Sequence, residues 1–454
     1  MWTDENRRNW WQADYFSAKA ANSFQVRRML RMRSRYEVAN NPYLFGVTNS
    51  NADDLVNTGP TLKCTRSSAA ENRQIERAWS DWWEEVEGVQ KLKTCKLART
   101  VDGEGFLVLK TVEELEHPVK LYPVDIEADQ VTTPAPANLA DLWVDGLTLN
   151  PVTGKPVSYH VLKHHPGDFY FPDFNPLKVE VIPKRHVIHW FQQFRPGQVR
   201  GIPTFTSSLD LFTEMRSFRK SVVANASLAA TLTAVIETQT QGNFTDDDAI
   251  QPFSKAPIDR GMLTTLPYGY KLNAFNPAQP GTTYEMFTQN CLAEACRPLA
   301  YPLNLALGTS QRFNFSSAKL DHINYRNGLT VERKDCGVKV MDQLFRAFIE
   351  EARLIPGLLP RSIRSVRDIP HEWHWPGYES IDPVNDANAD HQRLANGTLT
   401  FREFWARRGQ DWEDMMLQQS LERALIDKYE LNFGMPASRT ITEAQDPAAE
   451  PSYA

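Results

Sequence analysis

The hydrophobic pattern of this 454-residue chain changes its period along the sequence, and this change limits the folds that the chain can adopt. Apolar residues first recur three and four positions apart, which places them on one face of a helix. The clearest such face consists of Ile75, Trp79, Trp82, Trp83 and Val86. Between Gly105 and Val199, short apolar or alternating runs separated by Pro, Gly and Asp predict a mixed sheet with turns. The sequence therefore predicts an α+β fold.

The helical period returns after this sheet and is interrupted by a long insert. An apolar stripe predicts the first helix and comprises Leu209, Phe212, Met215 and Phe218. Residues 232–283 lose the helical pattern and are rich in Gly, Pro, Asn and Thr. A second helix is expected from near Tyr284 to Pro298 or Pro302, because proline ends or kinks a helix.

A polar loop, a long helix and a helical C-terminal part follow. The loop is expected over residues 308–315 and the helix over residues 316–353. Asp382-Pro383 is typical of a helix start, and the spacing of Thr400 and Glu403 is typical of a capping box. Residues 438–454 are rich in Pro, Ala, Glu and Ser, a composition that predicts disorder.

The charge balance excludes a uniformly basic surface. The chain has 50 Lys and Arg against 56 Asp and Glu, a net charge of −6, whereas nucleic-acid-binding domains are typically basic. A local basic patch is still compatible with this balance. One short segment predicted to be helical contains Arg27, Arg28, Arg31, Arg33 and Arg35. These arginines form either a solvated helix face or a contact surface for phosphate or an acidic partner.

The cysteines and the hydropathy pattern predict a soluble protein with reduced thiols. The five cysteines form no C-x-x-C pair, and an odd, sparse set is typical of a cytosolic setting. The charged N-terminal segment lacks the apolar core of a signal peptide. The longest uncharged stretch, residues 221–236, falls short of the roughly 20 apolar residues that span a bilayer.

The ten histidines raise the question of metal binding, and their spacing argues against it. His371 and His374 are three positions apart, whereas the zinc-binding helix motif requires four. His186 and His189 lie in an apolar strand at odd spacing, so we expect them to face opposite sides as structural histidines. The sequence also lacks a nucleophile elbow, a P-loop and a dinucleotide fingerprint. We therefore predict no catalytic residue, no metal site and no cofactor.

Two segments carry a recognisable pattern. Residues 186–203 have the sequence HVIHWFQQFRPGQVRGIP, which resembles the H-x-F…R-P-G-Q-x-R-G-x-P signature of lambda-type bacteriophage portal proteins. Residues 303–308, followed by residues 314–319, resemble the family's N-Y-S-S-x-R motif, with Phe315 in place of Tyr and Lys319 in place of Arg. The resemblance covers nearly the whole chain.

The resemblance implies a portal-protein fold with an α/β wing, a helical stem, an inserted clip, a tunnel loop and a helical crown-like region. The implied boundaries are 1–202 for the wing, 203–231 for one stem helix, 232–283 for the clip, 284–303 for the second stem helix, 304–316 for the tunnel loop, 317–376 for a long helix and the return to the wing, 377–437 for the crown-like region and 438–454 for a disordered tail.

The resemblance also implies a structural role without catalysis. Portal proteins form a ring of about twelve subunits at one capsid vertex, and double-stranded DNA passes through it during packaging and ejection. The implied partners are further copies of the chain, the DNA, the terminase large subunit, the major capsid or scaffolding protein, and a head–tail adaptor. The implied location is the virion, with the host cytoplasm during assembly, and no membrane is involved.

Polar and charged residues near the implied channel and clip are the candidate functional residues. The tunnel-loop candidates that would guide DNA are Gln311, Arg312, Asn314 and Lys319. The stem candidates, which would face the channel or pair with acids of a neighbouring subunit, are Arg216, Arg219 and Lys220. The clip candidates for docking a partner are Asp246, Asp247 and Asp248.

Two alternatives remain open on the sequence alone. Another ring-forming connector or tail protein would lack the order of helix, insert and helix. A cytosolic metal-dependent hydrolase using His371 or His374 would bind a metal ion through these side chains.

Overall fold

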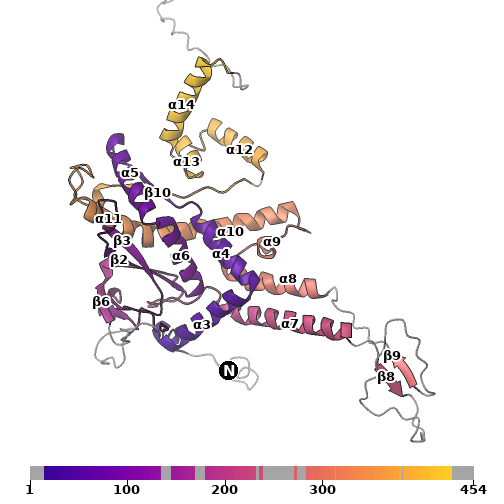
Figure 1. Ribbon diagram of the computed structural model, residues 1–454. Coiled ribbons are helices and arrows are strands. Elements are labelled where there is room, and N and C mark those ends of the chain that lie inside the picture. Colours follow the sequence, from indigo (N-terminus) through magenta and orange to yellow (C-terminus); the bar gives the residue numbers. More distant parts are fainter. Residues whose placement is uncertain are drawn as a thin grey trace, which may run out of the picture. The chain divides into compact units, whose positions relative to one another are not determined.

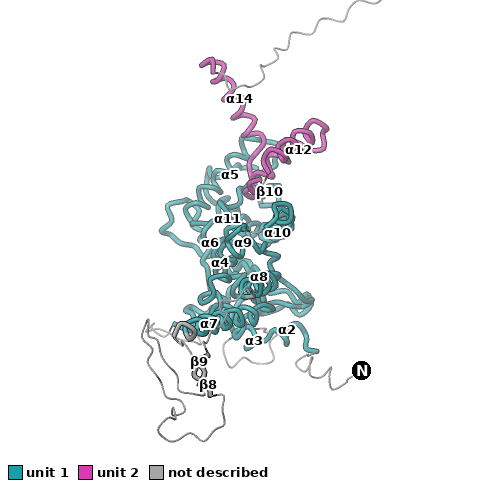
Figure 2. The backbone as a smooth tube through the Cα atoms, turned by 90° about the vertical axis from the view of Figure 1, so that its right-hand side faces the viewer, with its two compact units in different colours: residues 1–373 teal, residues 374–454 magenta. Residues whose placement is uncertain are grey.

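The computed structural model describes residues 15–133, 145–168, 179–231, 235–238, 270–273, 283–311, 313–380 and 382–431. The chain divides into two units, residues 1–373 and residues 374–454, each described by itself below (Figure 2).

The N-terminal part of unit 1 is helical. Its helices are α2 (Ala18–Ala21), α3 (Phe24–Asn40), α4 (Pro42–Val56), α5 (Ala69–Glu85) and α6 (Gly88–Val101). Asn41 separates α3 from α4, because its side chain accepts a hydrogen bond from the Tyr43 amide and Pro42 occupies the first turn of α4. Helix α5 closes at its C-cap Val86, and Gly88 is the first residue of α6.

Two three-stranded antiparallel sheets take the place of the one mixed sheet that the sequence predicted. In the first, the order β3-β2-β7 joins Leu121–Ile126, Glu104–Thr111 and Val187–Phe191. In the second, the order β4-β5-β6 joins Leu147–Leu149, Pro156–Leu162 and Val179–Pro183. The 3₁₀ turn η1 (Lys184–His186) connects β6 to β7. Side chains of both sheets form one apolar core, which includes Phe106, Val108, Leu147, Tyr159 and Val187.

The long helix predicted over residues 316–353 is present with a change of helical geometry inside it. Its parts are α10 (Phe315–Cys336), a π-helical turn η4 (Gly337–Met341) and α11 (Asp342–Ala352). The apolar face of α11 is buried, and the ring centroids of Phe345 and Phe348 each lie 5.4 Å from that of Trp79 in α5. The helix that was predicted from the apolar face containing Trp79 is therefore confirmed as α5. Strand β1 (Thr61–Cys64) pairs with β10 (His371–His374), and the 3₁₀ turn η5 (Val366–Asp368) precedes β10.

A pair of helices extends away from the sheets of unit 1 (Figure 1). They are α7 (Leu209–Thr231), preceded by the 3₁₀ turn η2 (Thr206–Ser208), and α8 (Thr283–Ala295), followed by η3 (Arg297–Leu299) and α9 (Leu303–Leu307). The two helices contact each other through aromatic rings, since the Phe218 centroid lies 4.6 Å from that of Phe287 and 5.8 Å from that of Tyr284. Between them, β8 (Val235–Thr238) and β9 (Tyr270–Asn273) pair in antiparallel fashion.

Unit 2 is helical over its described residues. Its helices are α12 (Pro383–Ala395), α13 (Phe401–Ala406) and α14 (Trp412–Lys428). The predicted capping box of Thr400 and Glu403 is confirmed at the start of α13. The predicted tail, residues 438–454, lies outside the described residues. Across the described parts of both units, no helix combines the length and the hydrophobicity that a membrane span requires.

Candidate functional site

The buried face of helix α3 is polar. Its buried residues are Arg27, Arg31, Ser34 and Glu37. The interpretation of the arginine segment as a solvated helix face is therefore wrong for Arg27 and Arg31. A contact of these two guanidinium groups with phosphate is excluded for the same reason, because both are enclosed by the chain itself.

The centre of this buried network is the pair formed by Arg200 and Glu104. The guanidinium of Arg200, from the R-P-G-Q-x-R-G-x-P segment, donates to both carboxylate oxygens of Glu104 at 2.7 Å. The amide of Gly201 donates to the same carboxylate at 2.8 Å. Burial alone would raise the pKa of Glu104, but Arg200 and His189 outweigh it and hold the pKa well below the usual value. Glu104 is therefore ionised, and the signature segment is fixed to the start of β2.

His189 completes the environment of Glu104. Its Nε2 lies 3.2 Å from Glu104 Oε1, and its ring stacks on Phe106 with centroids 4.2 Å apart. Burial lowers the pKa of His189 to about 4, so the ring is neutral near pH 7 and Nε2 carries the proton that it donates to Glu104. The prediction of a structural histidine at this position is confirmed.

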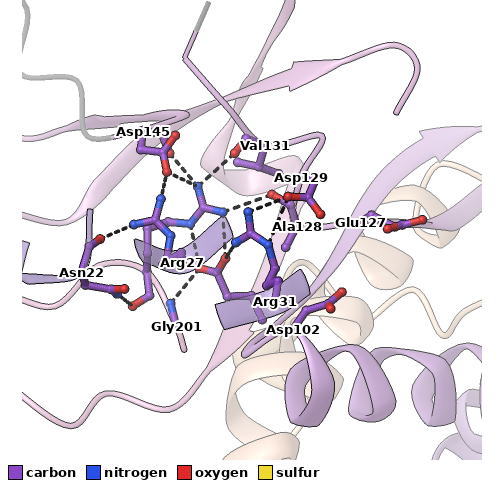
Figure 3. Close-up of polar contacts among 12 residues, drawn as sticks. Asn22, Arg27, Arg31, Asp102, Glu127, Ala128, Asp129, Val131, Asp145 and Gly201 are labelled. Atoms are coloured by element: carbon purple, nitrogen blue, oxygen red, sulfur yellow. Dashed lines mark hydrogen bonds and ion pairs between the residues drawn. The ribbon is translucent and has the colours of Figure 1, made fainter. Parts of the chain in front are cut away.

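The arginines of α3 reach acids from several separate segments (Figure 3). Arg27 forms an ion pair with Asp145, and Arg31 forms one with Asp129 at 2.6 Å. Arg35 makes a two-pronged contact with Asp102 at 2.7 Å. Burial, followed by repulsion from Arg200, lowers the pKa of Arg27 to about 9, which leaves it charged at neutral pH. The network therefore ties α3 to both sheets and to the end of α6.

Glu37 extends this network to the extended helix pair. Its carboxylate accepts hydrogen bonds from Arg216 at 2.6 Å and from the Thr213 hydroxyl at 3.0 Å, both on α7. Of the three stem candidates, Arg216 is thus held by an acid of the same chain, whereas Arg219 and Lys220 are exposed on α7. Helix α7 is anchored to α3 by these polar contacts.

The tunnel-loop candidates lie around the start of α10. Asn314 caps this helix by accepting a hydrogen bond from the Ser316 amide at 3.2 Å. Gln311 is exposed in the turn before the helix, and Lys319 is half-buried in its first turns. Arg312 lies outside the described residues, as do the clip candidates Asp246, Asp247 and Asp248.

The arrangement of the histidines differs from that of a zinc protease. His371 and His374 lie in the strand β10, and His371 Nε2 is 3.4 Å from Asp342 Oδ1, which also accepts from Trp373 at 2.8 Å. Within the described ranges, the side chains that come close enough together to share a metal ion are Glu127, Asp129 and His165. Because Asp129 already forms ion pairs with Arg31 and Arg35, guanidinium groups supply the positive charge there.

Sequence reasoning missed the acidic half of the network. The partners of Glu104 come from positions far apart from it in the sequence. The sequence nevertheless contained a signal for this pairing. Glu104 directly precedes the apolar run of β2, and a carboxylate at the start of a buried strand requires a cation as partner.

Comparisons of the sequence relate the chain to phage portal proteins. The family model described as phage portal protein, lambda family, matches residues 4–333. A "Probable portal protein" of Halomonas phage phiHAP-1 is 23% identical over 274 residues, 59% of this chain and 52% of the relative. Portal protein B of Escherichia phage lambda is 22% identical over 286 residues, 56% of this chain and 54% of the relative. The chain thus matches about half the length of these curated relatives.

Solved structures also align with the chain. The neck of an empty gene transfer agent particle aligns at a TM-score of 0.47 and 13% identity, covering 82% of this chain and 91% of the other. A HK97 family phage portal protein from Corynebacterium diphtheriae aligns at a TM-score of 0.31 and 12% identity, covering 64% and 83%. Because the family model matches well over half of the sequence, the chain belongs to the lambda family of phage portal proteins.

Proposed function

We propose that this chain is the subunit of a portal ring of about twelve copies at one vertex of a phage or phage-like particle. Double-stranded DNA would pass through the ring during packaging and again during ejection. The observation that carries the proposal is the match of residues 4–333 to the portal family.

The parts of the subunit are assigned by the same proposal. Helices α7 and α8 belong to the stem segments, residues 203–231 and 284–303, and the insert between them is the clip. Residues 1–202 and 317–376 form the wing, and residues 304–316 form the tunnel loop. Residues 377–437 form the crown-like region. The aromatic contacts between α7 and α8, and the anchoring of α7 through Glu37, support a rigid stem.

The charge of the chain suits a channel that passes DNA without holding it. Each phosphate contact by Lys or Arg adds to a salt-dependent affinity, and a net charge of −6 limits such contacts. Arg219 and Lys220, which are exposed on α7, are the basic groups of the stem that would centre the duplex. The tunnel-loop residues Gln311, Arg312, Asn314 and Lys319 would contact the DNA at the narrowest point.

The proposal assigns the chain several binding partners and no chemistry of its own. The acidic clip segment with Asp246, Asp247 and Asp248 would dock the terminase large subunit during packaging and a head–tail adaptor afterwards. The wing would contact the major capsid or scaffolding protein. The ring would form in the host cytoplasm and remain in the virion.

Electron microscopy of the purified full-length protein in negative stain tests this function. We expect rings of about twelve subunits with a central hole wide enough for duplex DNA. A closed dimer or tetramer without a channel would contradict the proposal.

A further inference from the structure

A pocket with an excess of positive charge lies between the turn η1 and the segment formed by η4 and α11. Its volume is about 480 Å³, and its charged lining residues are three cations, Lys184, Arg185 and Arg346, and one acid, Glu350. Strand β6, which leads into η1, and helix α11 lie on the side of unit 1 away from the extended helix pair (Figure 1). The pocket thus has an excess of two positive charges in a chain whose net charge is −6, and it lies apart from the proposed stem.

The two arginines of the pocket carry charge that no acid of the described chain neutralises. Neither Arg185 nor Arg346 forms an ion pair with a residue that the structure describes. Arg185 donates to the ring of His186 at 2.9 Å. Asp342, one helical turn before Arg346, instead accepts a hydrogen bond from the Trp373 indole at 2.8 Å. Both arginines are exposed, so their remaining N–H donors are available to a ligand.

Lys184 is fixed by the fold and keeps one donor for a ligand. Its ammonium donates to the Val187 carbonyl at 2.8 Å and to the Gln343 side-chain oxygen at 3.0 Å. An ammonium has three N–H donors, so one remains. Burial, followed by repulsion from Arg346, lowers the pKa of Lys184. A bound anion would relieve this repulsion between like charges.

The number of charges indicates the kind of anion that fits. A phosphate monoester carries about −1.5 to −2 at pH 7 and has three acceptor oxygens, which matches three cations and an excess of two charges. A carboxylate carries a single charge, and one arginine can bind it through both oxygens. The volume of the pocket lies in the range of small-molecule sites, roughly 300–1,000 Å³, so there is room for the group that carries the phosphate. Val338, which is 60% exposed, offers this group an apolar contact.

We propose that this pocket binds a phosphate monoester through Lys184, Arg185 and Arg346. The phosphate would belong either to a small phosphorylated molecule, such as a nucleotide, or to the 5′-phosphorylated end of a DNA strand. All lining residues belong to one copy of the chain, so binding does not require the proposed ring. The site is also distinct from Arg219 and Lys220 on α7, which the proposed function assigns to the duplex in the channel.

Calorimetric titration of the full-length protein with adenosine monophosphate in phosphate-free buffer tests the site. We expect adenosine monophosphate to bind and adenosine, which lacks the phosphate, not to bind. Arg185→Gln with Arg346→Gln is expected to weaken binding by about tenfold or more. The matched control, Arg28→Gln with Arg33→Gln, removes the same charge from exposed positions on α3 and is expected to bind as the wild type does.

Glu350→Gln gives a measurement of opposite sign. It removes the acid of the pocket and is expected to bind adenosine monophosphate severalfold more tightly, because a carboxylate repels the phosphate. This variant also tests the site if the double arginine variant does not fold. Equal binding of adenosine monophosphate and adenosine, equal affinities in the two double arginine variants, an unchanged affinity in Glu350→Gln, or equal displacement by the carboxylate N-acetylaspartate would overturn the proposal.

Short DNA duplexes distinguish the two sources of the phosphate. If a duplex with 5′-phosphate ends binds more tightly than the same duplex without them, and Arg185→Gln with Arg346→Gln abolishes the difference, the ligand is a DNA end. If both duplexes bind alike while adenosine monophosphate binds, the ligand is a small phosphorylated molecule. Both outcomes support the phosphate site.

Discussion

At the scale of single residues, the network around Glu104 depends on complete pairing. A buried carboxylate is costly unless cations and hydrogen-bond donors surround it, and removing one partner of such a pair typically costs about 3–5 kcal/mol. Arg200, His189 and the Gly201 amide together satisfy Glu104. The R-P-G-Q-x-R-G-x-P segment is thus fixed by the buried ion pair between Arg200 and Glu104, so Arg200 has a structural role.

The neutral state of His189 predicts a pH dependence of stability. Its pKa is about 4 in the folded chain against 6.5 for an ordinary histidine, so the unfolded chain binds more protons between these values. Stability therefore falls as the pH drops from 6.5 toward 4, by up to about 3 kcal/mol from this residue. In urea unfolding at several pH values, we expect His189→Gln to have a shallower pH dependence than the wild type. Identical slopes for the two proteins would contradict the assignment.

At the scale of secondary-structure elements, the periodicity of the sequence predicted the features that neighbouring residues determine, namely apolar helix faces and helix caps. The tryptophan face of α5, the apolar face of α11 and the capping box of α13 were all recognisable from spacing. The orientation of α3 was not, because its burial depends on acids from distant segments. Asp102, Asp129 and Asp145 meet these arginines only in the folded chain, and no short-range pattern links them.

The close approach of two backbone segments gives a prediction at the same scale. Gly103 has a φ of +88°, and a Cβ there would lie 2.2 Å from the backbone carbonyl carbon of Ile202. A typical substitution lowers the free energy of unfolding by about 1 kcal/mol, and we expect Gly103→Ala to lower it by more. Gly328 in α10 has open space around it, so Gly328→Ala is the control and is expected to stabilise by about 0.5–1 kcal/mol. Equal effects in thermal unfolding would show that the contact is not tight.

At the scale of the whole molecule, the chain neutralises much of its most arginine-rich segment internally. Arg27, Arg31 and Arg35 are paired with acids of the same chain, as are Arg200 and Arg216. The sequence left open that this segment binds phosphate, and ion pairs within the chain occupy these guanidinium groups instead. Of the basic residues on α7, Arg219 and Lys220 are exposed, whereas Arg216 is paired with Glu37.

The salt dependence of DNA binding follows from this distribution of charge. We expect assembled rings to bind a short duplex weakly, with an affinity that falls as salt rises. Each phosphate contact contributes about 0.9 to the slope of log affinity against log salt. Arg219→Glu with Lys220→Glu is therefore expected to lower the slope by up to about 2 for each subunit that contacts the duplex. The control, Lys155→Glu with Lys163→Glu, changes the net charge equally at exposed positions outside the stem, so fluorescence anisotropy should show a nearly unchanged slope. If both double variants lower the slope alike, the overall charge governs DNA binding and these two stem residues have no special part in it.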